Sequence, residues 1–502
     1  MARGHDRAHA MRSFTTLVAL SLACGCASPH VVAPISKSHV EHASATPAPE
    51  KYEAPQQTAP AASTADALLE WIKPKLPPGG SASRDEKGEL VVRHHGAAKE
   101  TIYSVAKAYV GLTTIYMPND LAKSIAKVNG INPAQDPRVE GKTITIPDIV
   151  DAPFKSPDEE RMPWPQDRAL RAIYLGGRDA LGTWEDTLDR LKARNMNAVI
   201  LDGKAYEGDI TYPTKVDVAV KDGAAKDAPI VDLPRTIRFA HMRGVRVIMR
   251  ISCFHDPYSA VKAPDLSVKG YWGGPYPIGW LDPGNDRAQK YVLDLVEEVI
   301  ALGADEVNLD YVRYPVQRGL GNADFHLKDT NRTRVGVITD FVAKVHAVTK
   351  AHHIPLSVDI FGVTATGTQQ DVDGLGQDIG KLSPNVEVLM PMVYPSHYGT
   401  GFYGWDVPGN HPEIVGIGTA AAVKKAAPKD PSTPSAIVRP WLQAFMWRSP
   451  EYGPNYLARE IVSGDKAGGV GYAMWNPGGH YGDAWIAVKP SQPNDGRHLT
   501  ER

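Results

Sequence analysis

Between residues 165 and 490 the chain alternates short apolar runs with longer amphipathic stretches, and this alternation limits the possible folds more than any other feature. Eight runs have the length of a strand: Ala172–Leu175, Ala198–Leu201, Val245–Ile251, Glu306–Leu309, Leu356–Val358, Glu387–Met390, Ile437–Leu442 and Val470–Met474. Helical periodicity is clear in segments between them, for example Thr183–Asn195, Leu233–Arg243, Arg287–Leu302 and Val335–His352. Strands that alternate with helices pair in parallel. Eight such units in about 320 residues predict an α/β fold of the (β/α)8 TIM-barrel type.

An open, doubly wound parallel sheet is the alternative fold for the same alternation. Such a sheet normally carries a glycine-rich phosphate-binding turn after its first strand. Here the first strand runs into Leu175-Gly176-Gly177-Arg178, which matches that turn only weakly. The barrel is therefore the preferred prediction.

The fourth predicted strand ends in a cluster of polar and aromatic side chains. It lies in the segment GADEVNLDYVRYP, residues 303–315, and stops at Asp310, which is followed by Tyr311, Arg313 and Tyr314. In a (β/α)8 barrel, catalytic groups lie at the C-terminal ends of the strands. A carboxylate there indicates acid, base or nucleophile chemistry on a polyol substrate. The alternative is that Asp310 and Arg313 form a structural ion pair that caps the strand.

The fifth strand carries a second carboxylate, Asp359. Glycosidic cleavage needs one ionised carboxylate and one that its surroundings keep protonated, so Asp310 and Asp359 are the candidate catalytic pair. Other strand ends supply groups that could hold a sugar by hydrogen bonding or aromatic stacking. These candidate substrate-binding residues are Asp202, Lys204, Arg250, Arg313, Tyr394, His397, Trp441, Gln443 and Trp475.

Some of these residues have a structural role as the alternative. Asp359 could pair with Arg250 or Lys204 inside the barrel, and Trp441 and Trp475 could belong to its upper core. Lone histidines at strand ends, such as His397, are expected to form hydrogen bonds rather than to bind a metal.

Composition and motifs exclude several functions. The 55 basic and 57 acidic residues are balanced, so no nucleic-acid partner is expected. The chain contains no His-Glu-x-x-His motif, phosphate loop or nucleophile elbow. We predict neither a metal nor a cofactor, and the lack of a His/Asp ligand cluster argues against a metal-dependent polysaccharide deacetylase. Cys253 follows an apolar run and is expected to be a buried free thiol.

Residues 1–26 have the features of an export signal. Met11-Arg12-Ser13 precedes a short apolar stretch, Phe14–Ala23, and small residues follow around Cys24 and Cys26. The segment resembles a bacterial lipoprotein signal, in which one of these two cysteines would be lipidated and would anchor the protein to a membrane. Residues 27–88 are expected to form a Pro/Ala-rich linker, with a short helix near Ala65–Lys73.

Residues 89–150 predict a small β-α-α-β domain. The strand LVVRHH is followed by two helical patterns, one with Ile102, Val105 and Tyr109 and one with Leu121 and Ile125, and the strand TITIP closes the domain. This order resembles a LysM domain, a module that binds glycans containing N-acetylglucosamine. Lys99-Glu100-Thr101 stands where that family has Gly-Asp-Thr, and the loop between the helices is longer.

From Arg171 to Trp485 the chain resembles a bacterial family known as "putative glycosyl hydrolases", close to the α-amylase-like barrels. The resemblance rests on residues 197–204 (NAVILDGK), 280–285 (WLDPGN), 305–315 (DEVNLDYVRYP) and 390–398 (MPMVYPSHY). It implies that Asp310 is the nucleophile and Asp359 the general acid/base, with Arg250 and Arg313 keeping Asp310 ionised. The family commonly has Asp-Val-Lys where this chain has Asp202-Gly203-Lys204.

Together these features predict an exported glycoside hydrolase of the cell envelope that acts on a polysaccharide or a peptidoglycan-type glycan. The alternative is a non-catalytic glycan-binding envelope protein whose barrel has kept the groove and lost the reaction. The expected barrel domain comprises residues 165–490.

Overall fold

The computed structural model describes residues 64–490 except 178–181, 318 and 328–329. The described residues form two compact units, one ending at Ser156 and the other starting at Pro157. The predicted signal and its two cysteines lie outside the described residues. None of the described helices is long and apolar enough to cross a membrane.

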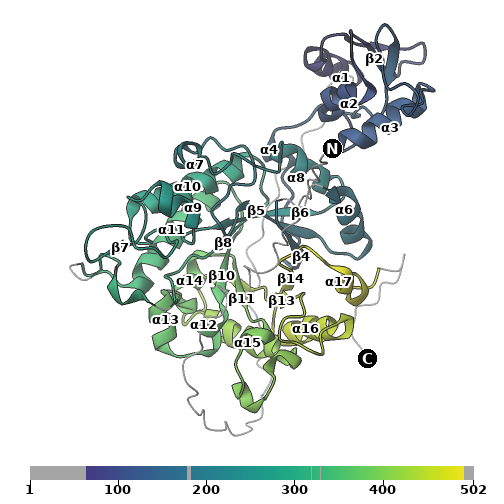
Figure 1. The fold of residues 1–502 in the computed structure, drawn as a ribbon. Coiled ribbons are helices and arrows are strands. Elements are labelled where there is room, and N and C mark those ends of the chain that lie inside the picture. Colours follow the sequence, from purple (N-terminus) through teal and green to yellow (C-terminus); the bar gives the residue numbers. More distant parts are fainter. Residues whose placement is uncertain (1–63, 178–181, 318, 328–329, 491–502) are drawn as a thin grey trace, which may run out of the picture. The chain divides into compact units, whose positions relative to one another are not determined.

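The larger unit is a closed barrel of parallel strands with helices around it (Figure 1). Its strands are β4 (Leu170–Leu175), β5 (Ala198–Lys204), β6 (Arg246–Ser252), β8 (Glu306–Asp310), β10 (Leu356–Phe361), β11 (Val388–Met392), β12 (Ile437–Val438), β13 (Trp441–Gln443) and β14 (Gly471–Trp475). They are ordered β10-β8-β6-β5-β4-β14-β13-β11, and pairing of β11 with β10 closes the circle. The (β/α)8 prediction is confirmed. The seventh predicted strand is divided into β12 and β13 because Pro440 cannot donate to the ladder.

The four helices predicted by periodicity are present within two residues of their expected ends. They are α6 (Trp184–Ala193), α8 (Leu233–His241), α10 (Asp286–Ala301) and α11 (Arg334–Ala351). The other α-helices described in this unit are α4 (Pro157–Glu160), α7 (Asp217–Asp222), α9 (Pro257–Lys262), α12 (Gly362–Thr366), α13 (Gln369–Leu375), α14 (Ile379–Leu382), α15 (Glu413–Ala426), α16 (Pro454–Lys466) and α17 (Gly482–Ala487). A short antiparallel pair, β7 (Lys269–Gly270) and β9 (Ala323–Asp324), lies outside the barrel wall.

Alternation along the strands decides which side chains enter the barrel. The interior cluster contains Leu170 and Ala172 of β4, Ala198 and Ile200 of β5, and Ile248 of β6. Side chains of successive strand residues point to opposite faces, so the next inward positions are Tyr174, Asp202 and Arg250. The apolar interior therefore gives way to polar groups at the C-terminal ends of these strands.

In the part that the structure describes, the smaller unit has a three-stranded antiparallel sheet, β1-β2-β3, and the α-helices α1, α2 and α3. Its elements are α1 (Thr64–Ile72), β1 (Gly80–Arg84), β2 (Leu90–His95), α2 (Ile102–Tyr109), α3 (Pro118–Val128) and β3 (Thr143–Ile146). The predicted β-α-α-β order is present from β2 to β3. Thr101 and Ser104 form a capping box at the start of α2.

The linker expected to reach residue 88 is shorter than predicted. In its described part, β1 pairs with β2, and Ile72 of α1 is fully buried in the core of the small unit. The sequence of β1 is GSASR, which has no large apolar side chain and hence no visible alternation. This strand is held by backbone pairing, which leaves no hydrophobic signal in the sequence.

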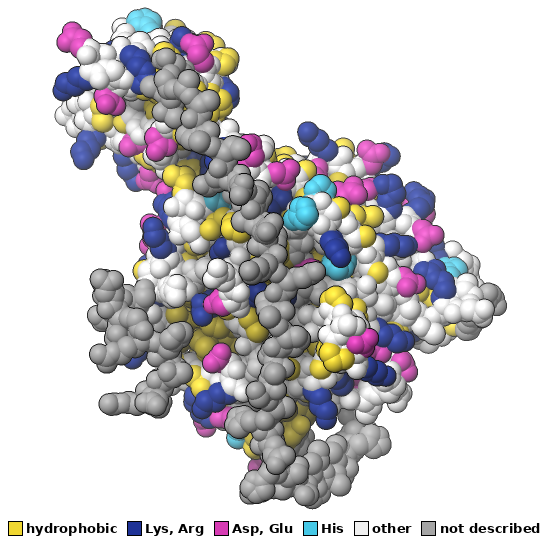
Figure 2. Space-filling model, turned by 180° about the vertical axis from the view of Figure 1, so that it is seen from behind, with side chains coloured by type: hydrophobic (Ala, Val, Ile, Leu, Met, Phe, Trp, Pro, Cys, Tyr) yellow, Lys and Arg dark blue, Asp and Glu magenta, His cyan; other side chains and the backbone are white. Residues whose placement is uncertain are grey.

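Charges of both signs are interspersed on the face shown in Figure 2. This mixture agrees with the balanced composition of the chain.

Candidate active site

Asp310 ends β8 and is held by a buried arginine. Nη2 and Nε of Arg250 donate to Oδ2 of Asp310 at 2.6 and 3.1 Å. The backbone N–H of Tyr311 donates to Oδ1 at 2.6 Å. Tyr311 has a φ of 49°, a strained conformation for a residue with a side chain. Both oxygens of this carboxyl group thus accept hydrogen bonds, and Oδ2 contacts the guanidinium.

The same guanidinium binds a second carboxylate. Nη1 of Arg250 donates to Oδ1 of Asp202 at 2.5 Å, and the Tyr174 hydroxyl donates to Oδ2 of Asp202 at 2.6 Å. Burial raises the pKa of Asp202, and Arg250 and Tyr174 oppose that rise. Burial alone would lower the pKa of Arg250, but Asp202 and Asp310 raise it well above its usual value. Arg250 is therefore a fixed cation between two carboxylates.

Asp359 lies at the same end of the barrel in a different environment. It is 1% exposed, and its Oδ1 accepts hydrogen bonds from Nε1 of Trp441 at 2.7 Å and Nδ2 of Asn308 at 3.0 Å. Burial, and next the negative charge of Asp310, raise the pKa of Asp359 well above its usual value. The two carboxyl groups thus lie in different environments: Asp310 contacts a guanidinium, and Asp359 is driven toward the protonated form.

Such a pair can perform acid/base or nucleophilic chemistry on an acetal. Glycosidases use one ionised carboxylate beside one protonated carboxyl, with roles set by environment. No group of three or more His, Cys, Asp and Glu side chains in the described chain is placed to hold a metal ion.

Aromatic rings at or just beyond the C-terminal ends of β11, β13 and β14 line one side of the site. The Tyr394 ring lies 5.5 Å from Trp475, 5.8 Å from Phe445 and 5.2 Å from His397, centroid to centroid. Burial, followed by the charges of Asp359 and Asp310, raises the pKa of Tyr394, so its hydroxyl lies in the field of both carboxyl groups. Burial lowers the pKa of His397 to about 4. This histidine is neutral at neutral pH.

The opposite side is lined by rings that follow β5, β6 and β8. His255 stacks on Tyr206 at 4.2 Å and lies 5.0 Å from Tyr311 and 5.3 Å from Trp280. The guanidinium of Arg313 lies 5.1 Å from the Trp280 ring and 5.2 Å from the Tyr311 ring. Arg313 thus packs into an aromatic wall, and its Nη1 donates to the backbone carbonyl of Tyr314 at 3.1 Å. The two aromatic walls suit the apolar faces of sugar rings.

Lys204 is not in the site, contrary to the prediction. It is 0% exposed, and its Nζ lies 3.0 Å from Oδ2 of Asp256 and donates to the Ser252 carbonyl at 2.6 Å. The register of β5 against β6 shifts between Asp202 and Lys204, a bulge that changes the face to which the next side chain points. Lys204 consequently faces Tyr291 of α10, on the helix side of the wall.

Gln443 is a structural residue, also contrary to the prediction. It is fully buried, its Oε1 accepts the N–H of Ser396, and its Nε2 donates to the Phe445 carbonyl and to Oγ of Ser449. The amide ties two loops of the aromatic wall together. Trp441 is 2% exposed and donates to Asp359, which fits the alternative of an upper-core residue and not the stacking of a sugar.

Tyr174 and Asn308 belong to the site and were missed by the sequence reasoning. Tyr174 holds Asp202, and Asn308 holds Asp359. Both occupy inward positions, two residues after Ala172 and two before Asp310. The period of two along β4 and β8 would have identified them. Cys253 is a buried free thiol, as predicted.

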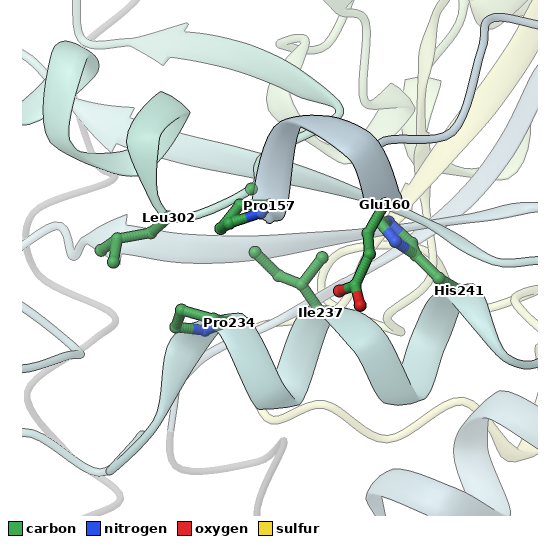
Figure 3. Close-up of a pocket in the computed structure, with 7 residues that line it drawn as sticks. Pro157, Glu160, Pro234, Ile237, His241 and Leu302 are labelled. Carbon is green, nitrogen blue, oxygen red and sulfur yellow. The ribbon is translucent and has the colours of Figure 1, made fainter. Parts of the chain in front are cut away.

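Two hollows on the barrel unit lie away from these residues. One, lined by Pro157 and Glu160 of α4 and by Ile237 and His241 of α8 (Figure 3), is at the N-terminal end of the strands and has a volume of about 10 Å³. It has room for a single water. The other, about 510 Å³, runs between α7 and α10 and is lined by charges of both signs. Neither contains a carboxyl group of the candidate pair.

Comparison with known proteins supplies the family. A model of the family described as "Putative glycosyl hydrolase domain" matches residues 172–481. No curated protein matches the chain.

Solved structures also resemble it. A hypothetical protein from Ruminiclostridium thermocellum is 25% identical, covering 37% of this chain and 96% of that one, with a TM-score of 0.33. An α-galactosidase from Thermus thermophilus is 15% identical, covering 64% of this chain and 62% of that one, with a TM-score of 0.38. A spore cortex-lytic enzyme of Bacillus megaterium is 12% identical, covering 86% of this chain and 96% of that one, with a TM-score of 0.38. TM-scores this low do not bear on the reaction. The family model alone matches more than half of the chain, and the chain therefore belongs to this glycosyl hydrolase family and to the glycoside hydrolase class.

Proposed function

We propose that this glycoside hydrolase is exported and cleaves an envelope or extracellular polysaccharide with Asp310 and Asp359. The single observation that carries the proposed mechanism is the difference between the two carboxyl groups. Arg250 binds Asp310, whereas burial and the charge of Asp310 raise the pKa of Asp359. This is the division of charge that glycosidic cleavage requires.

In the proposed reaction, Asp359 gives its proton to the glycosidic oxygen as the bond from that oxygen to the anomeric carbon breaks. Asp310 forms a bond to the anomeric carbon, and Arg250 holds it in place. Water, deprotonated by Asp359, then displaces Asp310 and restores both groups. The aromatic walls around Tyr394 and His255 would hold the sugar rings.

The small unit is proposed to keep the enzyme near its glycan. Its β-α-α-β order is that of a glycan-binding LysM module, and tethering raises the effective concentration of a substrate. Glu100 stands where that family has aspartate; its Oε2 is 2.8 Å from Nε2 of His94 and accepts the N–H of Ala97 at 2.7 Å. The contacts of Glu100 with His94 and Ala97 therefore hold the loop before α2 in place. Export rests on the apolar segment Phe14–Ala23, and anchoring on lipidation of Cys24 or Cys26.

A non-catalytic glycan-binding protein is the second candidate, and one observation favours it. Asp359 is 1% exposed and is covered by its hydrogen bonds to Trp441 and Asn308. A group so enclosed reaches a substrate only if these covering side chains move.

Release of reducing ends distinguishes the two functions. Residues 27–502 of the wild type, Asp310→Asn and Asp340→Asn would be incubated with a panel of bacterial envelope and extracellular polysaccharides. Asp340 is an exposed residue of α11 and serves as the matched control. Release by the wild type and Asp340→Asn, but not by Asp310→Asn, supports the hydrolase. Retention of all three proteins on a glycan without any release supports the binding protein.

A further inference from the structure

Trp447 and Arg448 form an exposed pair beside the aromatic wall that contains Tyr394 and His397. Trp447 is 40% exposed, and the Arg448 guanidinium lies 5.3 Å from the centre of its ring. Met446, the residue before them, is 69% exposed. Large apolar side chains in water offer a contact surface that the fold itself does not use.

The backbone presents this pair rigidly. Gln443 donates to the Phe445 carbonyl and to Oγ of Ser449, which fixes both ends of the loop 445–449. Arg448 has a φ of 51°, and a Cβ at Gly409 would overlap the Arg448 carbonyl oxygen. Strained backbone that its surroundings hold in place is concentrated at functional sites. The loop is thus fixed from below while its two side chains remain in solvent.

A continuous series of rings joins this pair to the carboxyl groups. The Trp447 ring lies 5.3 Å from the His397 ring, and the His397 ring lies 5.2 Å from that of Tyr394. After burial, the charges of Asp359 and Asp310 raise the pKa of Tyr394. Arg448 also acts on His397, since its charge adds to burial in lowering the pKa of that histidine. A glycan chain that binds at the two carboxyl groups and extends along the rings of Tyr394 and His397 therefore reaches Trp447 and Arg448.

Among the described residues, no carboxylate neutralises the charge of Arg448. Within the described part of the chain, no carboxylate lies within 4.0 Å of its guanidinium, whereas Arg250 in the same site binds two carboxylates. A guanidinium is well shaped to bind a carboxylate with two parallel hydrogen bonds. The cation at the edge of the site is thus available to an anionic group of the substrate.

We propose that Trp447 and Arg448 form an outer subsite for an acidic sugar, with the sugar ring on the indole and its carboxylate on the guanidinium. This inference rests on the proposed function and specifies its substrate class as a carboxylate-bearing polysaccharide. The carboxylate can come from a uronic acid or from the lactyl group of muramic acid in peptidoglycan strands freed of peptide.

The test compares each glycan with its carboxyl-reduced form, which has the same backbone without the charge. The probes are hyaluronan and polygalacturonate for uronic acids, and amidase-treated peptidoglycan strands for muramic acid. The full chain is used as wild type, Arg448→Gln, Arg448→Lys and Trp447→Ala. Met242→Ala is the matched control, because Met242 is 51% exposed and follows α8 at the opposite end of the barrel.

We expect the wild type to release reducing ends about tenfold faster from a native acidic glycan than from its reduced form, the size of one charge-assisted hydrogen bond. Arg448→Gln should abolish this preference, Arg448→Lys should keep part of it, and Trp447→Ala should slow cleavage of both forms. Met242→Ala should behave as the wild type. The glycan that shows the preference identifies the source of the carboxylate.

Equal rates on native and reduced glycans, or a preference that survives Arg448→Gln, would overturn the inference. If the wild type releases nothing, the proposed hydrolase fails while the subsite is still tested by affinity electrophoresis of the same variants in the same glycans. Retardation by the native form that Arg448→Gln removes supports the subsite. Lack of retardation by every acidic glycan would also overturn it.

Discussion

The indole N–H of Trp441 donates a 2.7 Å hydrogen bond to Oδ1 of Asp359, from β13 to β10 across the barrel interior. This bond stabilises the ionised form of Asp359, whereas burial and the charge of Asp310 stabilise the protonated form. The balance of these effects sets the pKa of Asp359, and hence the highest pH at which this residue still holds the proton for a leaving group.

Trp441→Phe should move the alkaline limb of kcat/KM to higher pH. Removal of the N–H donor takes away an interaction that lowers the pKa of Asp359, so the carboxyl group stays protonated longer as the pH rises. The measurement is kcat/KM against pH on any glycan that the wild type cleaves. Trp475→Phe is the matched variant, because the contacts described for Trp475 are with the rings of Tyr394 and Phe445. An alkaline limb that Trp441→Phe leaves in place, or moves to lower pH, contradicts this role of Trp441.

Arg250→Gln should abolish turnover and lower the free energy of unfolding by about 3–5 kcal/mol, because it leaves Asp202 and Asp310 buried without their cation. Urea unfolding and release of reducing ends measure the two effects. Asp202→Asn in the same chain should restore part of the stability and none of the turnover, because Asp310 still lacks its partner. Arg190→Gln removes an exposed ion pair of α6 and should change stability by less than about 1 kcal/mol. A stable Arg250→Gln variant would refute this account of the cluster.

Strand periodicity predicted the barrel and most of its site because inward positions repeat every second residue. Asp202, Arg250, Asp310 and Asp359 all lie at such positions, and the structure brings them together at one end of the barrel. The family resemblance implied that Arg250 and Arg313 act on Asp310, and the structure places Arg250 there. Strand periodicity alone did not separate Arg250 from Lys204, because both are cations at strand ends.

Lys204 and Gln443 were misplaced for physical reasons that a linear pattern does not carry. A bulge in β5 turns Lys204 toward α10, and bulges depend on how two strands pair. Gln443 lies at an inward position of its strand, as predicted, but its amide forms hydrogen bonds with Ser396 and Ser449 of the loops that follow the strands. In both residues a buried polar group is satisfied by the protein, which only the three-dimensional structure reveals.

Lys204→Met should destabilise the protein by about 3–5 kcal/mol, because the carboxylate of Asp256 would remain buried without a cation. Lys204→Met with Asp256→Leu should recover much of this loss, since a buried ion pair is often replaceable by apolar residues. Thermal and urea unfolding measure both variants. If Lys204→Met unfolds like the wild type but loses its affinity for glycan, the original prediction of a substrate-binding lysine is right after all.

His255 should make the barrel unit sensitive to mild acid. Burial lowers its pKa from 6.5 to about 4, so the folded state holds a neutral imidazole that the unfolded chain protonates first. The resulting stability is fully present above about pH 6.5 and is lost as the pH falls toward 4 and below.

His255→Gln tests this linkage, because the glutamine amide can still donate to the Tyr206 carbonyl that lies 2.8 Å from Nδ1 of His255. At pH 7 the variant should be less stable than the wild type. The gap should narrow as the pH falls from about 7 to 4.5, because only the wild type has to protonate this histidine on unfolding. Urea unfolding at a series of pH values measures the gap, and His480→Gln, which changes an exposed histidine, is the control. A gap for His255→Gln that stays constant over this range would mean that the buried imidazole does not control the acid sensitivity.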